Sequence, residues 1–296
     1  MIGKGPSCCR KRGQKQLTDE QPSDAIAPEA IDPSRPGIGP GGIGLTDDFI
    51  MAVRFFSRLP TGSIAHQKPE LNRIAMALPL ASLAIGAGPA LLLLGGGLVG
   101  LPGYFAAALA VGAMVLVSGA MAEDALADAA DGLFGGQSPA RRLEIMKDSR
   151  HGTYGVAALC LFIMLRVTGL GAVAASSPLA AAAIWLAASI AGRSGALWLV
   201  VALPAARPDG LAAMAGAVSG RSFAVGAVFA VLLLFVLGGP ATNLLALGLA
   251  IAAALAVMAS WSALCRRLVG GQTGDLIGAL GALVEIAVLA ALLPFA

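Results

Sequence analysis

The chain has 296 residues, of which 57% are hydrophobic and 12% are charged, and its mean hydropathy is +0.81. A soluble domain carries about 25% charged residues, so the composition excludes an ordinary soluble globule and predicts an integral membrane protein. The net charge of +3 is too small to indicate nucleic-acid binding, and the 4 cysteines form neither a disulfide framework nor a zinc motif.

The N-terminal part of the chain differs from the rest. Residues 1–42 are rich in Pro, Gly, Ser and charge, and we predict a disordered cytoplasmic tail. Residues 43–73 are predicted to form an amphipathic helix and a linker, because Phe49, Val53 and Phe56 fall on one stripe. This pattern is typical of a helix in the membrane surface and equally of a surface helix packed on the same protein, and both interpretations remain open.

Residues 74–296 contain apolar stretches that are each long enough to cross about 30 Å of hydrocarbon. None of them alternates like a strand, and their Ala, Leu and Gly content suits close helix packing. We therefore predict an all-α, polytopic membrane bundle of about seven transmembrane helices. The predicted spans are residues 74–99, 104–122, 155–174, 179–203, 222–238, 241–264 and 276–293.

The charges follow this topology. Every Lys and Arg except Arg166 and Arg193 lies in the tail or in loops on one predicted side of the membrane. The positive-inside rule then predicts a cytoplasmic N-terminus and a site on the cytoplasmic side. Arg166, Arg193 and Glu285 are expected to face the bundle interior. Arg193 could contact an anionic ligand, or one arginine could form a structural ion pair with Glu285.

An acidic cluster is expected in a helix that runs straight out of the second span. Asp124, Asp128 and Asp131 are spaced i, i+4, i+7 and so share one helical face, with Glu123 on its flank. Such carboxylates repel one another unless a cation binds among them. Oxygen ligands suit Mg²⁺ first and Mn²⁺ second. A solvated helix end is the alternative, but the apolar neighbours favour a metal site formed by the three aspartates.

Two further polar segments lie on the same predicted side. Residues 138–155 combine Glu144 and Asp148 with several basic residues, including Lys147 and Arg150. Carboxylates and cations together suit a phosphate-bearing substrate with a bound metal, although the positive-inside pattern alone accounts for some of these cations. In residues 266–275, backbone amides and the Thr273 hydroxyl could cradle phosphate, and Asp275 could join the metal site. A plain interhelical turn is the open alternative.

Several of these motifs resemble those of the cobalamin synthase family. They are FFSRLPTG at 55–62, ALADAADG at 125–132, RRLEIMKDSRHGTYG at 141–155 and GGQTGD at 270–275. The resemblance covers about residues 45–296. It implies a Mg²⁺-dependent inner-membrane transferase, an adenosylcobinamide-GDP ribazoletransferase. Such an enzyme joins adenosylcobinamide-GDP to α-ribazole or α-ribazole 5′-phosphate, releases GMP and so assembles the nucleotide loop of coenzyme B12.

The resemblance also implies which residues act. It carries the acidic motif of the family onto Glu123, Asp124, Asp128 and Asp131, and a second motif onto Glu144, Asp148, Ser149 and Arg150. The chain departs from the family pattern H-x-D-G-L-A-D at Ala122 and Ala125, which replace the His and the first Gly.

A mechanism follows as a hypothesis. Mg²⁺ on Asp124, Asp128 and Asp131 binds the diphosphate, a ribazole hydroxyl attacks the phosphorus on the cobinamide side, and GMP leaves. Asp148 or Glu123 takes the proton, and Arg150 and Lys147 stabilise the negative charge. The predicted substrate-binding residues are Glu144, Ser149, Gly271, Gln272, Thr273, Asp275 and Arg193.

Two other functions are weighed against this one. A CDP-alcohol phosphotransferase also uses clustered aspartates, but no Ala-Arg pair follows Gly132 as its motif requires. A transporter would place its charges nearer the bilayer midplane, whereas most acids here lie at the predicted cytoplasmic edge. Beyond the substrates and membrane lipid, a homo-oligomer is left open, and no nucleic acid is expected.

Overall fold

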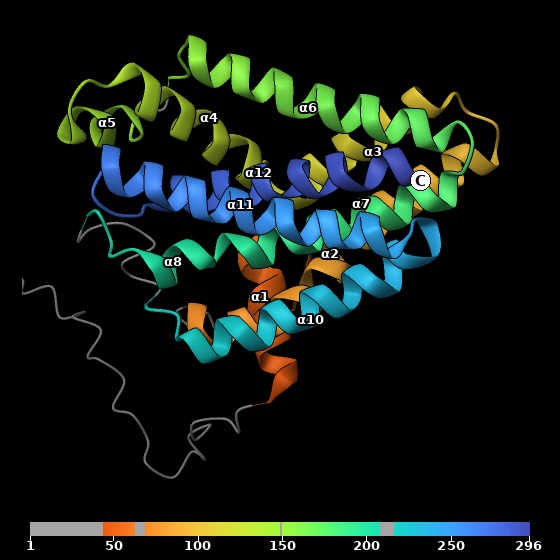
Figure 1. Ribbon diagram of the computed structural model, residues 1–296, viewed down its shortest axis with the longest axis horizontal. Helices are drawn as coiled ribbons and strands as arrows, with labels where there is room; N and C mark the ends of the chain where they lie inside the picture. Colours follow the sequence, from red (N-terminus) through yellow and green to blue (C-terminus); the bar gives the residue numbers. More distant parts are fainter. Residues whose placement is uncertain (1–43, 63–68, 149, 208–215) are drawn as a thin grey trace, which may run out of the picture. The chain divides into compact units, whose positions relative to one another are not determined.

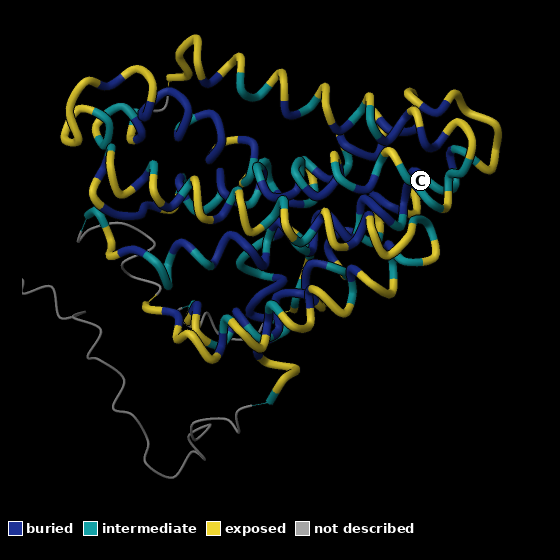
Figure 2. The backbone as a smooth tube through the Cα atoms, viewed as in Figure 1, coloured by how far each residue is buried: buried dark blue, intermediate teal, exposed yellow. Residues whose placement is uncertain are grey.

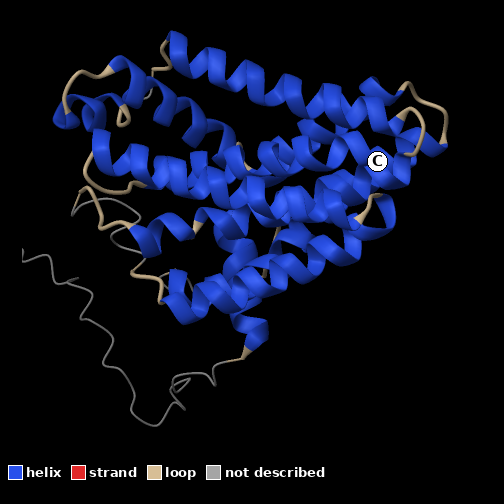
Figure 3. Ribbon diagram, in the orientation of Figure 1, coloured by secondary structure: helices blue, strands red, loops and turns tan. Residues whose placement is uncertain are grey.

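The computed structural model describes residues 44–62, 69–148, 150–207 and 216–296 (Figure 1). The predictions for the tail 1–42, for residues 63–68 of the linker and for Ser149 lie outside these described residues. The regular elements are helices (Figure 3), which confirms the all-α prediction. They are α1 Leu45–Phe56, α2 Leu71–Leu98, α3 Gly103–Ser118, α4 Met121–Gly135, α5 Pro139–Ile145, α6 Thr153–Ala174, α7 Pro178–Ala196, α8 Trp198–Ala202, α10 Gly220–Gly238, η1 Gly239–Ala241, α11 Leu244–Leu268, α12 Gly274–Leu292 and η2 Leu293–Phe295.

The membrane prediction is confirmed in its number of spans. In the part of the chain that the structure describes, six helical stretches are long and apolar enough to cross a membrane, and α3 with α4 would make a seventh if that bent pair is one span. The six are Leu71–Leu98, Thr153–Ala174, Pro178–Ala202, Gly220–Ala241, Leu244–Leu268 and Gly274–Phe295. The orientation of the N-terminus stays a prediction.

The interior and the outer surface follow from this packing. Helices α7 and α12 pack against each other and against several other helices, and much of α12 is buried in Figure 2. Trp185 of α7 is fully buried. By contrast, α6 and α10 expose large apolar side chains such as Met164 and Leu232, and this outward apolar surface suits contact with lipid.

One expectation about the acidic segment is wrong. Helix α4 does not continue α3 in a straight line, because the chain bends by 86° between them. The bend is made by Gly119 and Ala120, whose φ angles of 67° and 58° are left-handed. The backbone N–H of Arg58 donates to the carbonyl of Val117 at 2.8 Å, so the segment after α1 supports the bend. The bend therefore sets the direction in which the carboxylates of α4 project.

Helix α1 is packed on the bundle. Asp48 is only 2% exposed, and its Oδ1 accepts from Nε of Arg73 on α2 at 2.7 Å. Met51, Ala52 and Val53 are buried, and α1 contacts α2. The amphipathic pattern thus corresponds to a helix whose apolar side covers its own protein, and its end carries Phe55 and Phe56 toward the site described below.

We expect a methyl group at Gly119 to destabilise the fold. A left-handed backbone costs an L-residue about 1–2 kcal/mol, and the new Cβ would also meet the side chain of Arg58. Gly119→Ala should therefore lower the unfolding midpoint in detergent micelles. The control is Gly112→Ala within α3, where nothing lies within 4 Å of the added Cβ. Equal midpoints for the two variants would contradict this account of the bend.

Candidate active site

The segments that follow α4, α8 and α11 lie at one end of the helix bundle (Figure 1). Arg142 of α5 links the ends of α4 and α11. Its Nε donates to the Leu133 carbonyl at 3.2 Å, and its Nη1 donates to the Leu268 carbonyl at 3.0 Å. A cation suits these carbonyl ends of α4 and α11. The backbone N–H of Gln272 donates to the Pro204 carbonyl at 2.9 Å. Sequence reasoning missed this role of Arg142.

Carboxylates from two helices converge here. Asp124 and Asp128 lie on α4, and Asp275 lies in the first turn of α12. Burial, followed by the negative charges of Asp124 and Asp275, raises the pKa of the half-buried Asp128 to about 6. We call these three residues the carboxylate cluster. His151 places its Nδ1 3.6 Å from Oδ1 of Asp128.

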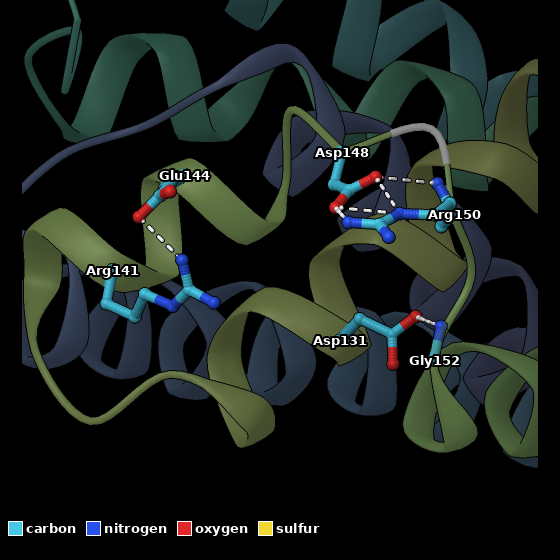
Figure 4. Close-up of polar contacts among 6 residues, drawn as sticks. All are labelled: Asp131, Arg141, Glu144, Asp148, Arg150 and Gly152. Carbon is cyan, nitrogen blue, oxygen red and sulfur yellow. Dashed lines mark hydrogen bonds and ion pairs between the residues drawn. The ribbon is translucent and has the colours of Figure 1, made fainter.

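Asp131 has backbone partners of its own, and its predicted role as a metal ligand stays a prediction. Its Oδ2 accepts from the backbone N–H of Gly152 at 2.6 Å (Figure 4), and its Oδ1 accepts from that of Gly155 at 2.8 Å. A Cβ at either glycine would press on this carboxylate. Asp131 thus satisfies the first amides of α6. Across the described ranges, no group of three or more His, Cys, Asp or Glu side chains is placed to hold a metal ion.

In the second polar segment, residues 138–155, acidic and basic side chains form ion pairs with one another. Arg150 donates from Nη2 to Oδ2 of Asp148 at 2.7 Å (Figure 4), and this pairing lowers the pKa of Asp148 to about 2. A carboxylate held in this way is a poor proton acceptor. Arg141 and Glu144 form a second exposed pair at 2.7 Å, and Lys147 is also exposed. The role of Asp148 as the base stays a prediction.

The third segment is an interhelical turn that also presents a carboxylate. The Thr273 hydroxyl accepts from the backbone N–H of Leu276 at 3.3 Å and caps α12. Gly271 allows the Pro204 carbonyl to approach, because a Cβ there would lie 2.6 Å from that oxygen. Gln272 is buried, and its Oε1 has no hydrogen-bond partner among the described residues. Asp275 is 3.5 Å from Arg207.

A charged network lies deeper in the bundle. Arg166 of α6 donates from Nη1 to Oε1 of Glu123 at 2.8 Å, and its Nε is 3.1 Å from Oε1 of Glu285. Trp185 donates from its indole nitrogen to the same Glu285 oxygen at 3.1 Å. Arg166 is 2% exposed. The predicted structural ion pair between Glu285 and an arginine is confirmed, and sequence reasoning missed that Glu123 completes it.

A cavity of about 280 Å³ joins the cluster to this network. Asp124 and Asp275 line it on one side, while Arg193 and Glu285 line it from within the bundle. Phe55, Phe56, Met114 and Leu197 are among its apolar walls. Ala122, where the family pattern has His, also lines the cavity. The predicted residues Glu123, Asp124, Asp275 and Arg193 are thus brought together, although they are far apart in sequence.

This fold and site define a multi-pass membrane protein with a carboxylate-lined cavity at one end of its helices. Comparison with known proteins identifies it further. The cobalamin-5-phosphate synthase family matches residues 48–293. The chain belongs to this family and is a transferase, as the sequence motifs predict.

Named relatives support the assignment. The adenosylcobinamide-GDP ribazoletransferase of Azorhizobium caulinodans is 45% identical over 253 residues, which cover 83% of this chain and 94% of the relative. The protein of the same name in Bradyrhizobium diazoefficiens is 42% identical over 246 residues, which cover 82% and 91% of the two chains. No solved structure matches the chain.

Proposed function

We propose that the chain is an adenosylcobinamide-GDP ribazoletransferase of the bacterial inner membrane. It joins adenosylcobinamide-GDP to α-ribazole or its 5′-phosphate, releases GMP and completes the nucleotide loop of coenzyme B12. The observation that carries this proposal is the match to relatives of that name over more than four fifths of the chain. The charge distribution supports a site that faces the cytoplasm.

The carboxylate cluster has the donor chemistry of a divalent-cation site, although the described side chains as placed do not form one. Its donors are all oxygen atoms, and a hard cation would relieve the repulsion that the charges of Asp124 and Asp275 exert on Asp128. We propose that these three residues hold Mg²⁺, with Asp275 in the place predicted for Asp131. When bound, the metal supplies Lewis-acid stabilisation of the diphosphate oxygens. Asp131 instead positions the loop that leads into α6.

Residues around the cavity and in the second polar segment carry out proton transfer and charge stabilisation in the proposed reaction. A ribazole hydroxyl oxygen forms a bond to the phosphorus on the cobinamide side, and the bond between that phosphorus and the GMP oxygen breaks. Glu123 accepts the hydroxyl proton. It lines the cavity, its Oε2 makes no hydrogen bond within the described residues, and Arg166 holds its other oxygen. Arg150 and Lys147 stabilise the negative charge on the departing GMP.

The remaining polar residues would bind substrate. The turn with Gly271, Gln272 and Thr273 lies beside the cluster residue Asp275, where the buried Gln272 side chain has an unused acceptor. Glu144 and Ser149 of the second segment would contact the nucleotide of the donor.

Turnover by the purified protein tests the function. In nanodiscs, we expect GMP release from adenosylcobinamide-GDP when an α-ribazole acceptor and Mg²⁺ are present, and its loss when the metal is chelated. A CDP-activated alcohol in place of the GDP donor should give no product. Product from the CDP donor alone would instead favour the alcohol phosphotransferase. Turnover that persists without divalent metal would contradict the proposed role of the cluster.

A further inference from the structure

Arg193 is an incompletely paired cation at the inner part of the cavity. Its Nη1 is buried and has no hydrogen-bond partner among the described residues. Its Nη2 donates to the thioether sulfur of Met114 at 3.2 Å, which is a weak acceptor. The nearby carboxylates of Glu123 and Glu285 are both held by Arg166. Because the buried Arg193 guanidinium has one weak acceptor and an unpartnered Nη1 among the described residues, it has N–H donors available for an anionic ligand.

The cavity beside Arg193 runs along one face of α12. This face consists mainly of small residues and ends at the carboxylate of Glu285. The lining residues of this face are Gly274, Gly278, Gly281, Ala282 and Glu285. Ten residues separate Asp275 from Glu285, a helical rise of roughly 15 Å. One part of the cavity is thus lined by Asp124 and Asp275 of the carboxylate cluster, and another part by the Arg193 cation. Apolar walls lie along the cavity.

The size of the cavity selects between the two substrates of the proposed reaction. Small-molecule pockets usually measure about 300–1,000 Å³, and this one has about 280 Å³. A corrinoid macrocycle that carries GDP is too large for it. The acceptor is a single nucleoside or nucleotide with a flat aromatic base, which suits walls that include Phe55, Phe56 and Met114.

We propose that the cavity is the acceptor site and that Arg193 binds the 5′-phosphate of α-ribazole 5′-phosphate. The base lies along the apolar walls, the acceptor hydroxyl faces the carboxylate cluster, and the corrinoid remains outside the cavity. This assignment rests on the proposed function and adds to it a residue that recognises the acceptor phosphate.

The test compares the two acceptors in steady-state kinetics. Arg193→Met should raise KM for α-ribazole 5′-phosphate by about 10- to 100-fold, as expected for a lost charged hydrogen bond. The effect on KM for α-ribazole should be much smaller, and KM for adenosylcobinamide-GDP should change little. Arg193→Lys should recover part of the loss. Arg221→Met, which removes an exposed cation on α10, is the matched control.

Two further measurements do not depend on the folding of the Arg193 variant. With the wild-type protein, inorganic phosphate should compete with the phosphorylated acceptor and not with the donor. Ala282→Phe should obstruct the cavity and raise KM for both acceptors, whereas Ala252→Phe on the exposed face of α11 should not. Phosphate competition with the donor alone, or equal losses with both acceptors in Arg193→Met, would overturn the assignment. Absence of wild-type turnover with either acceptor would overturn the proposed function itself.

Discussion

Asp128→Asn will reduce the turnover of adenosylcobinamide-GDP on the order of a thousandfold or more. A bound metal contributes several kcal/mol of transition-state stabilisation, and each 1.4 kcal/mol corresponds to about a factor of ten. Asp128 is half-buried, and the charges of Asp124 and Asp275 act on it, so its own charge would act on any cation in the cluster. The neutral amide keeps the shape of the side chain and removes that charge.

The measurement is the rate of GMP release at saturating substrate over a range of Mg²⁺ concentrations. The variant should need more Mg²⁺ for half-maximal activity as well as being slower. Asp47→Asn makes the same chemical change on the exposed side of α1 and should behave like the wild type. A variant at position 128 with near-normal, Mg²⁺-dependent turnover would refute the metal role.

Among the variants considered, Arg166→Met is expected to lower the free energy of unfolding most. The side chain is 2% exposed and is shared by Glu123 and Glu285, so its removal leaves two buried carboxylates without their cation. Breaking a buried pair in this way costs about 3–5 kcal/mol. The unfolding midpoint in detergent micelles or nanodiscs should fall accordingly, whereas Arg267→Met at the exposed end of α11 should leave it unchanged.

A combined variant separates the cost of unpaired charge from the cost of lost packing. Arg166→Met together with Glu123→Gln and Glu285→Gln removes every charge of the trio. Its stability should recover much of the loss, because replacing a whole buried ion network is often nearly neutral. If the triple variant is no more stable than Arg166→Met alone, the network does not act through charge balance.

The helical architecture could be predicted from the sequence because each spanning segment satisfies its own backbone hydrogen bonds within itself. Long apolar stretches such as 276–293 therefore define helices without knowledge of their neighbours. The bend at Gly119 and Ala120 could not be predicted in this way. Both residues sit within an apolar run, and their left-handed φ angles depend on how the segment around Arg58 packs.

By itself the sequence determined the class of protein, the approximate spans and the motifs that identify the family. Only the tertiary structure decided which charges meet. Asp275 joins Asp124 and Asp128 from another helix, Glu123 pairs with Arg166, and Asp131 turns to the amides of α6. The physical reason is that the spanning helices α6, α7 and α12 are apolar on nearly every face. Their hydrophobic pattern therefore does not specify their rotation, and the packing of α4, α6, α7 and α12 against one another does.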